Sequence, residues 1–278
     1  MSTTNQITEQ QRQTWNKFSG GWEKWDSWVL NWLGPIGTKL LDETELKQAD
    51  HVLDVSTGTG EPGLTAATRV AQVVATDVAE DMVEIARKNA QARRLENFKA
   101  EVADAESLPF SDEEFDAIVC RLGVMYFANP AAGVKEMSRV FKPGRKMALA
   151  AWSEPAKNPW ATTAAGVINK LLNLPAPSPD APGVFRCSRP GLLSELLGQA
   201  GLKEITQVEV SGESVYDSPE HYWEFVIDVV APVATPLNNV DEVMREQAKQ
   251  AVMEVTKPYQ KDGKVIFPWS CWVASGRK

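Results

Sequence analysis

Glycines, small hydroxyl residues and a carboxylate are concentrated in one short stretch at the end of an apolar run at 51–55. The stretch contains Asp54, Ser56, Thr57, Gly58, Thr59, Gly60, Pro62 and Gly63. Closely spaced glycines let a strand turn sharply into a helix while its backbone approaches a ligand. Pro62 suits the first helical turn, where its missing N–H is not needed. The spacing Gly58-x-Gly60-x-x-Gly63 matches the dinucleotide-binding pattern, which on its own is a weak indication of a nucleotide site.

Acidic residues beyond this turn narrow the choice of ligand. Asp77 ends the second apolar run, where a carboxylate accepts hydrogen bonds from ribose hydroxyls; the alternative is a simple helix N-cap. Asp54 precedes the glycines, where a fixed carboxylate would repel a pyrophosphate and attract an ammonium group. A second acidic loop, Asp104-Ala105-Glu106, could reach an adenine amino group. S-Adenosylmethionine combines ribose, adenine and a free amino acid without any phosphate.

Few side chains are available for proton transfer. Methyl transfer from a sulfonium is driven by the cofactor, and a base is needed only for a poor nucleophile such as a hydroxyl. Of the two histidines, His51 opens a strand and is interpreted as structural. His221 begins a helix, and it either enters the acceptor pocket or has a simple surface or helix-capping role. Tyr126 either lines that pocket or packs in the core. We take His221 and Tyr126 as the catalytic candidates, and Arg121 could pair with an acidic acceptor or with Asp54.

Short apolar runs alternate with helical patterns from 51 to 152, which is typical of a parallel sheet with helices on both faces. The pattern predicts strands at 51–55, 72–76, 97–102, 115–120 and 146–152, helices at 62–70, 80–93 and 130–141, and a turn at 142–144. Later segments predict helices near 160–174, 190–200 and 240–255 and strands at 204–210 and 265–274. These late strands extend the sheet at one edge, parallel or antiparallel to it. The predicted fold class is α/β, a doubly wound, Rossmann-like sheet.

Tryptophans are concentrated near the N-terminus, where five of the ten in the chain lie between Trp15 and Trp32. The spacing alternates between three and four residues, so a helix would place most of them on one stripe. We predict a helix at 5–19 that ends at Gly20-Gly21, a second at 22–33 that ends at Gly34-Pro35, and a third at 36–48. The stripe either packs on the sheet domain or forms the inner wall of a lid. A membrane-surface helix is disfavoured because its polar face has few Lys or Arg residues.

The composition excludes several classes of protein. A net charge of −8 and a pI near 5.0 disfavour a nucleic-acid partner, since such affinity needs clustered basic residues. Three cysteines without a C-x-x-C pair, and two histidines, give no support for a metal site or a disulfide framework. The N-terminus has no apolar signal core, and no apolar run approaches the roughly 20 residues of a membrane span. We therefore expect a cytoplasmic protein without stable membrane insertion, as a monomer or homodimer.

Four segments together resemble the class I S-adenosylmethionine-dependent methyltransferases, specifically the group that methylates quinone precursors of ubiquinone and menaquinone and its small-molecule relatives. These segments are VLDVSTGTGEPG (52–63), VVATDVAEDMVEIAR (73–87), ADAESLPFSDEEFDAIVCRLGV (103–124) and EMSRVFKPGRKMALAAW (136–152). The resemblance implies a seven-stranded sheet whose last strand is antiparallel. Ser56 departs from the Gly or Ala common at its position, so its side chain is expected to crowd or hydrogen-bond locally. Met125-Tyr126 replaces the Arg-Asn pair of the quinone enzymes, which argues against a quinone acceptor.

The resemblance also assigns cofactor contacts to the loops after the first four strands. The residues it implies are Asp54, Ser56, Thr57, Gly58, Thr59, Gly60, Asp77, Val78, Met82, Asp104, Ala105, Glu106 and Arg121. Residues 57–60 would line the methionine moiety, with Asp54 near its ammonium group through a water. Asp77 would hold the ribose, Met82 would pack beside the adenine, and the 104–106 loop would contact the adenine edge.

The sequence thus predicts a helical lid at 1–45 and a methyltransferase domain at 46–278, with a proline-rich insertion at 155–190 and a helical cover of the acceptor site at 219–258. The predicted function is methyl transfer from S-adenosylmethionine to a small aromatic or lipophilic acceptor by in-line displacement. One alternative is an NAD-dependent oxidoreductase, although the chain has no Tyr-x-x-x-Lys pair. The other is a catalytically silent scaffold that keeps the fold and binds the cofactor.

Overall fold

A computed structural model describes residues 3–175, 178 and 180–278. Pro177 and Pro179, which belong to the predicted proline-rich insertion, lie outside the described residues, as do residues 1, 2 and 176. Among the helices of the described ranges, none combines the length and the apolar character needed to cross a membrane.

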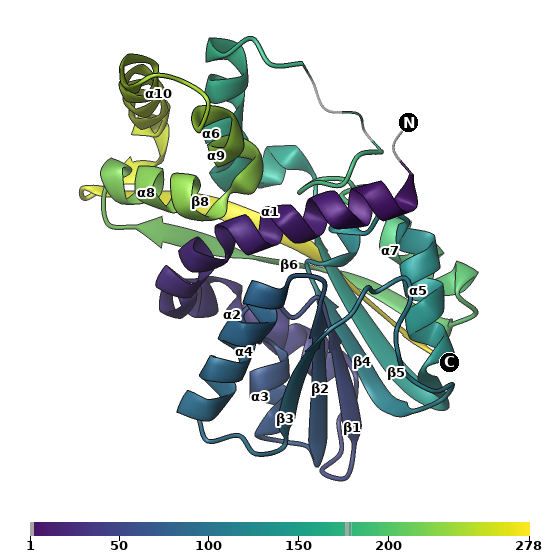
Figure 1. Cartoon of the computed structure of the whole chain (residues 1–278). Coiled ribbons are helices and arrows are strands. Elements are labelled where there is room, and N and C mark those ends of the chain that lie inside the picture. The colour runs from purple at the N-terminus through teal and green to yellow at the C-terminus, as the bar shows by residue number, and fades with distance from the viewer. Residues whose placement is uncertain (1–2, 176–177, 179) are drawn as a thin grey trace.

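A mostly parallel sheet forms the centre of the molecule (Figure 1). Its strands are β1 His51–Val55, β2 Gln72–Asp77, β3 Phe98–Val102, β4 Phe115–Arg121, β5 Phe141–Trp152, β6 Lys203–Tyr216, β7 Gln260–Lys261 and β8 Lys264–Arg277. The order is β3-β2-β1-β4-β5-β8-β6, with β8 antiparallel to both neighbours and the short β7 paired to β8. The chain order reverses beside β1, which pairs with both β2 and β4. In doubly wound sheets ligands bind at this switch point. The predicted fold class is confirmed.

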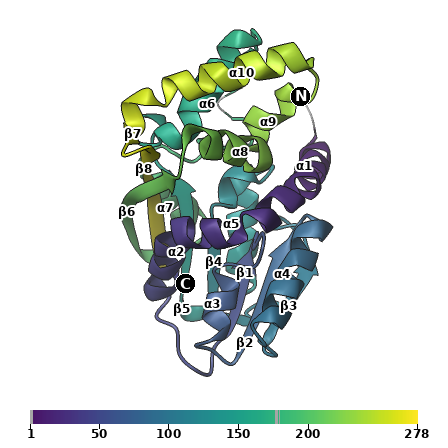
Figure 2. The same ribbon diagram turned by 90° about the vertical axis from the view of Figure 1, so that its left-hand side faces the viewer.

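Helices cover both faces of the sheet. The set comprises α2 Asp26–Glu43, α3 Gly63–Ala67 and α4 Glu80–Ala92 on one face, and α5 Pro130–Arg139 and α7 Leu192–Gln199 on the other (Figures 1 and 2). Each helix buries one apolar stripe; in α4 this stripe includes Met82, Val83 and Ile85. Burial of such stripes on the apolar strands forms the core and fixes the loops at the strand ends.

The N-terminal helices differ from the prediction. α1 Thr4–Lys24 continues through Gly20-Gly21. The helix is interrupted at Trp25, which caps the end of α1 and the start of α2, and α2 continues through Gly34-Pro35. Gly21 does not end the helix because it is needed for a close approach: a Cβ built there would lie 1.9 Å from the carbonyl oxygen of Asp228. Pro35 is tolerated because it lies on the exposed side of a helix whose other side is buried in the core. Tertiary packing therefore overrides the local helix-breaking preference of these residues.

A second layer of helices lies beyond the carboxyl ends of the parallel strands (Figure 1). It contains α6 Pro159–Leu171, α8 Pro219–Val229, α9 Ala231–Leu237 and α10 Glu242–Val255. The strands β6 and β8, each 14 residues long, extend further than predicted and connect this layer to the sheet. The predicted turn at 142–144 is wrong: these residues belong to β5, and Gly144 takes a positive φ of 74° beside an irregular register with β4.

Candidate active site at the switch point of the sheet

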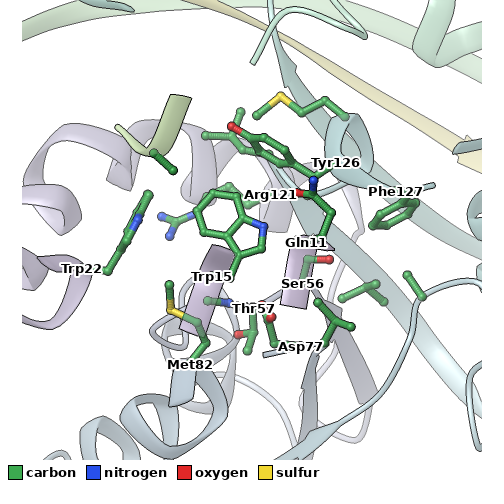
Figure 3. A pocket seen from close by; sticks show the side chains of 18 of the residues that line it. Gln11, Trp15, Trp22, Ser56, Thr57, Asp77, Met82, Arg121, Tyr126 and Phe127 are labelled. Carbon is green, nitrogen blue, oxygen red and sulfur yellow. Dashed lines mark hydrogen bonds between the residues drawn. The ribbon is translucent and has the colours of Figure 1, made fainter. Parts of the chain in front are cut away.

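A large cavity lies at the carboxyl ends of β1, β2 and β4, beneath α1 and α8. It contains about 1310 Å³ of empty space, part of it open to solvent. Its lining falls into two sets of residues (Figure 3). The loop set comes from the β1–α3, β2–α4 and β3–β4 connections, and the aromatic set comes from α1, α2, α6, α8 and the ends of β4 and β5.

Asp77 is the anchor of the loop set. One of its carboxylate oxygens accepts the Gly58 N–H at 3.0 Å, and the other accepts the Ala79 N–H at 3.0 Å. Ala79 is the N-cap residue of α4, so Asp77 is not the N-cap of that helix. Burial raises the pKa of the Asp77 carboxyl. Each oxygen accepts only one hydrogen bond from the described residues, which leaves Asp77 capacity to accept donors from a ligand.

Gly58 leaves the floor of the cavity open beside Asp77. Its φ is +57°, a conformation that favours glycine, and a Cβ built on it would meet no atom within 4 Å. The neighbours Ser56, Thr57 and Thr59 also line the cavity. Gly60 does not, because it packs against α3, where an added Cβ would lie 2.6 Å from Leu64 Cδ1. The turn therefore presents backbone to a ligand on one side and packs tightly on the other.

The remaining loop residues lie around the same end of the cavity. They are Glu61, Val78, Met82, Ala103, Asp104, Ala105 and Glu106. Glu106 accepts the Asn129 N–H at 2.7 Å, and burial raises the pKa of its carboxyl. Glu61, which the sequence analysis did not select, pairs with Arg93 of α4 at 2.5 Å. The pairing joins residues 32 apart in the chain, and no local pattern indicates it.

Asp54 lies beneath the glycine turn and outside the cavity lining. It is fully buried, and its Oδ2 accepts the Thr57 hydroxyl at 2.7 Å and the Gly63 N–H at 2.9 Å. Its Oδ1 is buried without a partner among the described residues. Burial raises the pKa of this carboxyl to about 7. Asp54 therefore holds the turn from below, and its contact with a ligand ammonium group through a water stays a prediction.

This pKa gives a testable pH dependence. Because the Asp54 pKa rises from 3.8 unfolded to about 7 folded, the folded state retains a proton that the unfolded state has lost, so stability falls as pH rises between these values. Replacing Asp54 by Asn removes this dependence. Between pH 5 and pH 8, the stability of Asp54→Asn relative to the wild type should rise by about 2 kcal/mol, measured by urea denaturation.

A matched control is Glu136→Gln. The hydrogen bond from Arg139 lowers the pKa of the Glu136 carboxyl, against the opposing effect of burial. Its stabilising effect is lost only as pH falls below the unfolded pKa, so the Glu136→Gln difference should stay nearly constant from pH 5 to pH 8. An equally constant difference for Asp54→Asn would contradict the assignment of a raised pKa to Asp54.

Eight aromatic rings form the other set of lining residues. They are Trp15, Trp22, Trp32, Tyr126, Phe127, Trp152, Trp160 and Phe225. Trp32 is central: its ring stacks on Trp152 with centroids 5.5 Å apart and meets Trp160 edge-on at 4.8 Å. The wall presents large apolar surface with defined ring orientations, which suits a flat apolar ligand.

The N-terminal tryptophans divide between the cavity lining and the packing of α2, and the predicted lid stays a prediction. Trp15, Trp22 and Trp32 line the cavity. Trp25 and Trp28 instead pack between α2 and the outer layer; their indole N–H groups donate to the Asp228 carboxylate and the Val215 carbonyl. The stripe is therefore partly inner wall and partly packing surface.

The loop set lies within a segment of the chain that matches a known protein family. Residues 52–144 match the family described as "Methyltransferase domain". The chain is a class I S-adenosylmethionine-dependent methyltransferase. Its cofactor is S-adenosylmethionine. In the described ranges, no group of three or more His, Cys, Asp or Glu side chains is placed to hold a metal ion.

Three individual proteins are similar to this chain over different shares of its length. A demethylmenaquinone methyltransferase of Deinococcus radiodurans is 39% identical over 108 residues, 38% of this chain and 44% of that protein. An uncharacterized protein of Mycobacterium tuberculosis is 24% identical over 259 residues, 88% of each chain. The crystal structure of YcgJ from Bacillus subtilis superposes with a TM-score of 0.59 at 20% identity, covering 87% of this chain and 97% of that one. At that identity the structural match supports the fold alone.

The two catalytic candidates of this methyltransferase lie in different places. Tyr126 lines the cavity with its ring 4.9 Å from that of Trp15, and burial raises the pKa of its hydroxyl well above the ordinary value, so the hydroxyl stays protonated. His221 is absent from the lining residues; its Nδ1 accepts the Asp217 N–H at 3.0 Å and its ring packs on Trp25. A catalytic role for either residue stays a prediction, and the position of His221 gives it no support.

Arg121 lines the cavity but does not form the predicted ion pair with Asp54. Its guanidinium has no carboxylate within 4.0 Å and no hydrogen-bond acceptor in the described part of the chain. Burial lowers the pKa of the guanidinium, against the opposing field of more distant carboxylates, of which Glu61 has the largest effect. The side chain lies beside α2: a Cβ built on Gly37 would be in ordinary contact with Arg121 Nη1, at 3.9 Å.

Proposed function

We propose that this enzyme transfers a methyl group from S-adenosylmethionine to a small aromatic or lipophilic acceptor. The observation that supports the proposal is that one cavity contains both sets of residues, the glycine-turn loops and the wall of eight aromatic rings. A cofactor bound on the loops would therefore face an acceptor held by the rings. This arrangement agrees with the general preference for apolar pockets that contain a few convergent polar groups.

The loop set fits S-adenosylmethionine in shape and in hydrogen-bonding character. The open backbone at Gly58 leaves room for the methionine moiety beside Thr57 and Thr59. Asp77 retains lone pairs for two ribose hydroxyls, and Met82 offers an apolar contact for the adenine ring. The 104–106 loop would contact the adenine edge. No phosphate-binding group is required at any of these positions.

The chain contributes mainly positioning and exclusion of water. When bound, S-adenosylmethionine supplies an activated methyl group that an acceptor nucleophile takes by in-line displacement. The aromatic rings would hold the acceptor in the reactive orientation, which is an effective way to accelerate a two-reactant step. The aromatic set contains no carboxylate, imidazole or amine among the described lining residues, and the Tyr126 hydroxyl stays protonated. We therefore expect an acceptor whose nucleophile needs no base from the protein.

The proposal is tested by replacing Asp77 with Ala and titrating S-adenosylhomocysteine by calorimetry. The substitution removes two charge-assisted hydrogen bonds to the ribose and the anchor of Gly58. Hydrogen bonds to charged groups contribute about 1.5–3 kcal/mol each, so affinity should fall by at least about 100-fold.

The matched control is Asp81→Ala, which removes an exposed carboxyl four residues further along the chain. Its affinity for S-adenosylhomocysteine should stay within about twofold of the wild type, as expected for an exposed group. Unchanged affinity in Asp77→Ala, with wild-type binding intact, would overturn the assignment of Asp77 to the ribose.

A further inference from the structure

The guanidinium of Arg121 lines the cavity and has no direct ion-pair or hydrogen-bond partner among the described residues. The side chain is partly buried, so its N–H groups are available to a ligand in the cavity. The side chain lies beside Gly37 of α2. In Figure 3 the guanidinium points to the part of the cavity where Trp15 and Trp22 lie. Glu61, Asp54 and Asp26 act on this cation only from beyond 4.0 Å, so a direct anionic partner would have to come from a ligand.

Two indole groups in the same cavity also lack acceptors. The Nε1 atoms of Trp22 and Trp32 are buried with no hydrogen-bond partner in the described ranges. By contrast, the Nε1 atoms of Trp25, Trp28 and Trp160 all donate to protein acceptors. Buried donors are normally satisfied, but Trp269 Nε1, outside the cavity lining, is a third buried indole nitrogen without a partner in the described ranges. Unpartnered indoles are therefore not specific to this cavity.

The aromatic set offers no opposing charge. Among its described residues are no Asp, Glu, Lys or His side chains. The carboxylates of the cavity, such as Asp77 and Glu106, belong to the loop set and already accept backbone N–H groups. This half of the cavity therefore combines a wide apolar wall with one cation, Arg121, and with uncharged polar groups that include the Thr8 hydroxyl, the Gln11 amide and the Tyr126 hydroxyl.

We propose that Arg121 binds the carboxylate of the methyl acceptor, and that the acceptor class is a flat, apolar carboxylic acid. A guanidinium matches the two oxygens of a carboxylate in a bidentate pair, and the rings contact the apolar body. The inference rests on the proposed function, because it identifies the substrate class of the same cavity.

The test uses matched acid and amide pairs as probes: benzoate, cinnamate, indole-3-acetate and 2-naphthoate, each against its uncharged amide. Binding to the wild type is measured by calorimetry with and without S-adenosylhomocysteine. At least one acid should bind at least tenfold more tightly than its amide. In Arg121→Gln that preference should disappear while the amide affinity stays unchanged, and Arg121→Lys should retain part of it. No preference for any acid, or a preference that survives in Arg121→Gln, would overturn the proposal.

A second titration separates the acceptor from the cofactor as the source of the carboxylate. S-Adenosylhomocysteine has an amino-acid carboxylate, and 5′-methylthioadenosine lacks it. If Arg121 binds the acceptor, Arg121→Gln should change the affinity for both nucleosides by less than threefold. A loss of more than tenfold for S-adenosylhomocysteine alone would assign Arg121 to the cofactor and overturn the proposal.

The stability of the variant provides a readout independent of ligands. Removing an unpartnered buried charge should leave the melting temperature of Arg121→Gln equal to or above that of the wild type; a large decrease would indicate a structural role and would overturn the proposal. Failure of the wild type to bind S-adenosylhomocysteine would contradict the proposed function instead, and the acid series without that nucleoside would still test Arg121.

Discussion

Replacing Gly21 by Ala is expected to lower the free energy of unfolding by about 2–3 kcal/mol, as overpacking of a close contact does. The added Cβ would lie 1.9 Å from the carbonyl oxygen of Asp228 and 2.7 Å from its carbonyl carbon. Both atoms belong to the backbone of α8, so no side-chain rotation relieves the overlap. α1 must move away from α8, which also disturbs the bonds that Lys24 and Trp25 donate to the Asp228 carboxylate, 2.7 and 2.9 Å long.

The displacement should reach the cavity because both helices line it. Trp22 of α1 and Phe225 and Val229 of α8 are lining residues, and their relative positions depend on the contact at Gly21. We therefore expect Gly21→Ala to weaken acceptor-site ligands as well as the fold. Urea denaturation and calorimetric titration of the probes described above measure the two effects separately.

Gly20→Ala is the matched control for this prediction. Gly20 is exposed in the same helix, and a Cβ built there would meet no atom within 4 Å. Alanine is a better helix former than glycine, so this variant should be more stable than the wild type by about 0.5–1 kcal/mol. Equal stabilisation by Ala at both positions would show that α1 and α8 are not in close contact in solution.

The same pair of glycines shows where prediction from sequence reaches its limit. Gly20-Gly21 was expected to end a helix, because glycine is unfavourable in helix interiors. That preference amounts to about 1 kcal/mol per residue, which burial of the α2 side chains and the close packing of α1 on α8 outweigh. Whether a glycine ends a helix or permits a close contact depends on a partner some 200 residues away, and no local window contains that partner.

The parallel sheet was predictable because its signals are local. Each parallel strand is a short apolar run followed by a turn, and the strands were placed to within one or two residues at β1 to β4. The long strands β6 and β8 were predicted too short. The missed end of β6, residues 211–216, alternates exposed and buried positions next to the outer helical layer. The missed end of β8, residues 275–277, pairs with β5 inside the main sheet.

The loop half of the site was predictable for a similar reason, and the aromatic half was not. The glycine turn, Asp77 and the 104–106 loop follow successive strands, so topology alone brings them to one edge of the sheet. Trp152, Trp160 and Phe225 join the N-terminal tryptophans only through tertiary packing. Composition indicated that the N-terminal tryptophans were unusual, yet the partners of Trp32 lie more than 100 residues further along the chain.

Gly123→Ala is expected to cost about 2–3 kcal/mol of stability, and the cost should depend on Ser56. Ser56 has a φ of +58°, a left-handed conformation that costs a non-glycine residue roughly 1–2 kcal/mol. The expected crowding of its side chain is relieved at Gly123: a Cβ built there would lie 2.4 Å from Ser56 Cβ and 2.8 Å from Ser56 Oγ. The absence of a side chain at Gly123 thus permits the presence of one at Ser56.

A double-mutant cycle isolates this dependence. Ser56→Gly alone should be neutral or stabilising by up to about 1 kcal/mol, since relief of the left-handed φ is offset by the extra freedom of glycine in the unfolded chain. In the Ser56→Gly background, Gly123→Ala should cost less than about 1 kcal/mol, because the two closest overlaps are removed and the next contact is the one of 3.0 Å with Cys120 Sγ. The expected coupling energy is therefore at least about 1 kcal/mol, within the range for residues in direct contact.

Binding should follow the same pattern as stability. Ser56 and Gly123 both line the cavity at the junction of the loop set and the aromatic set. A shift of the loop after β4 would displace Arg121 and Tyr126 together, so Gly123→Ala should weaken S-adenosylhomocysteine and the aromatic acids, and Ser56→Gly should restore both. Additive effects of the two substitutions would contradict direct contact between these loops. Restored stability without restored binding would show that Ser56 has a role at the ligand that glycine does not replace.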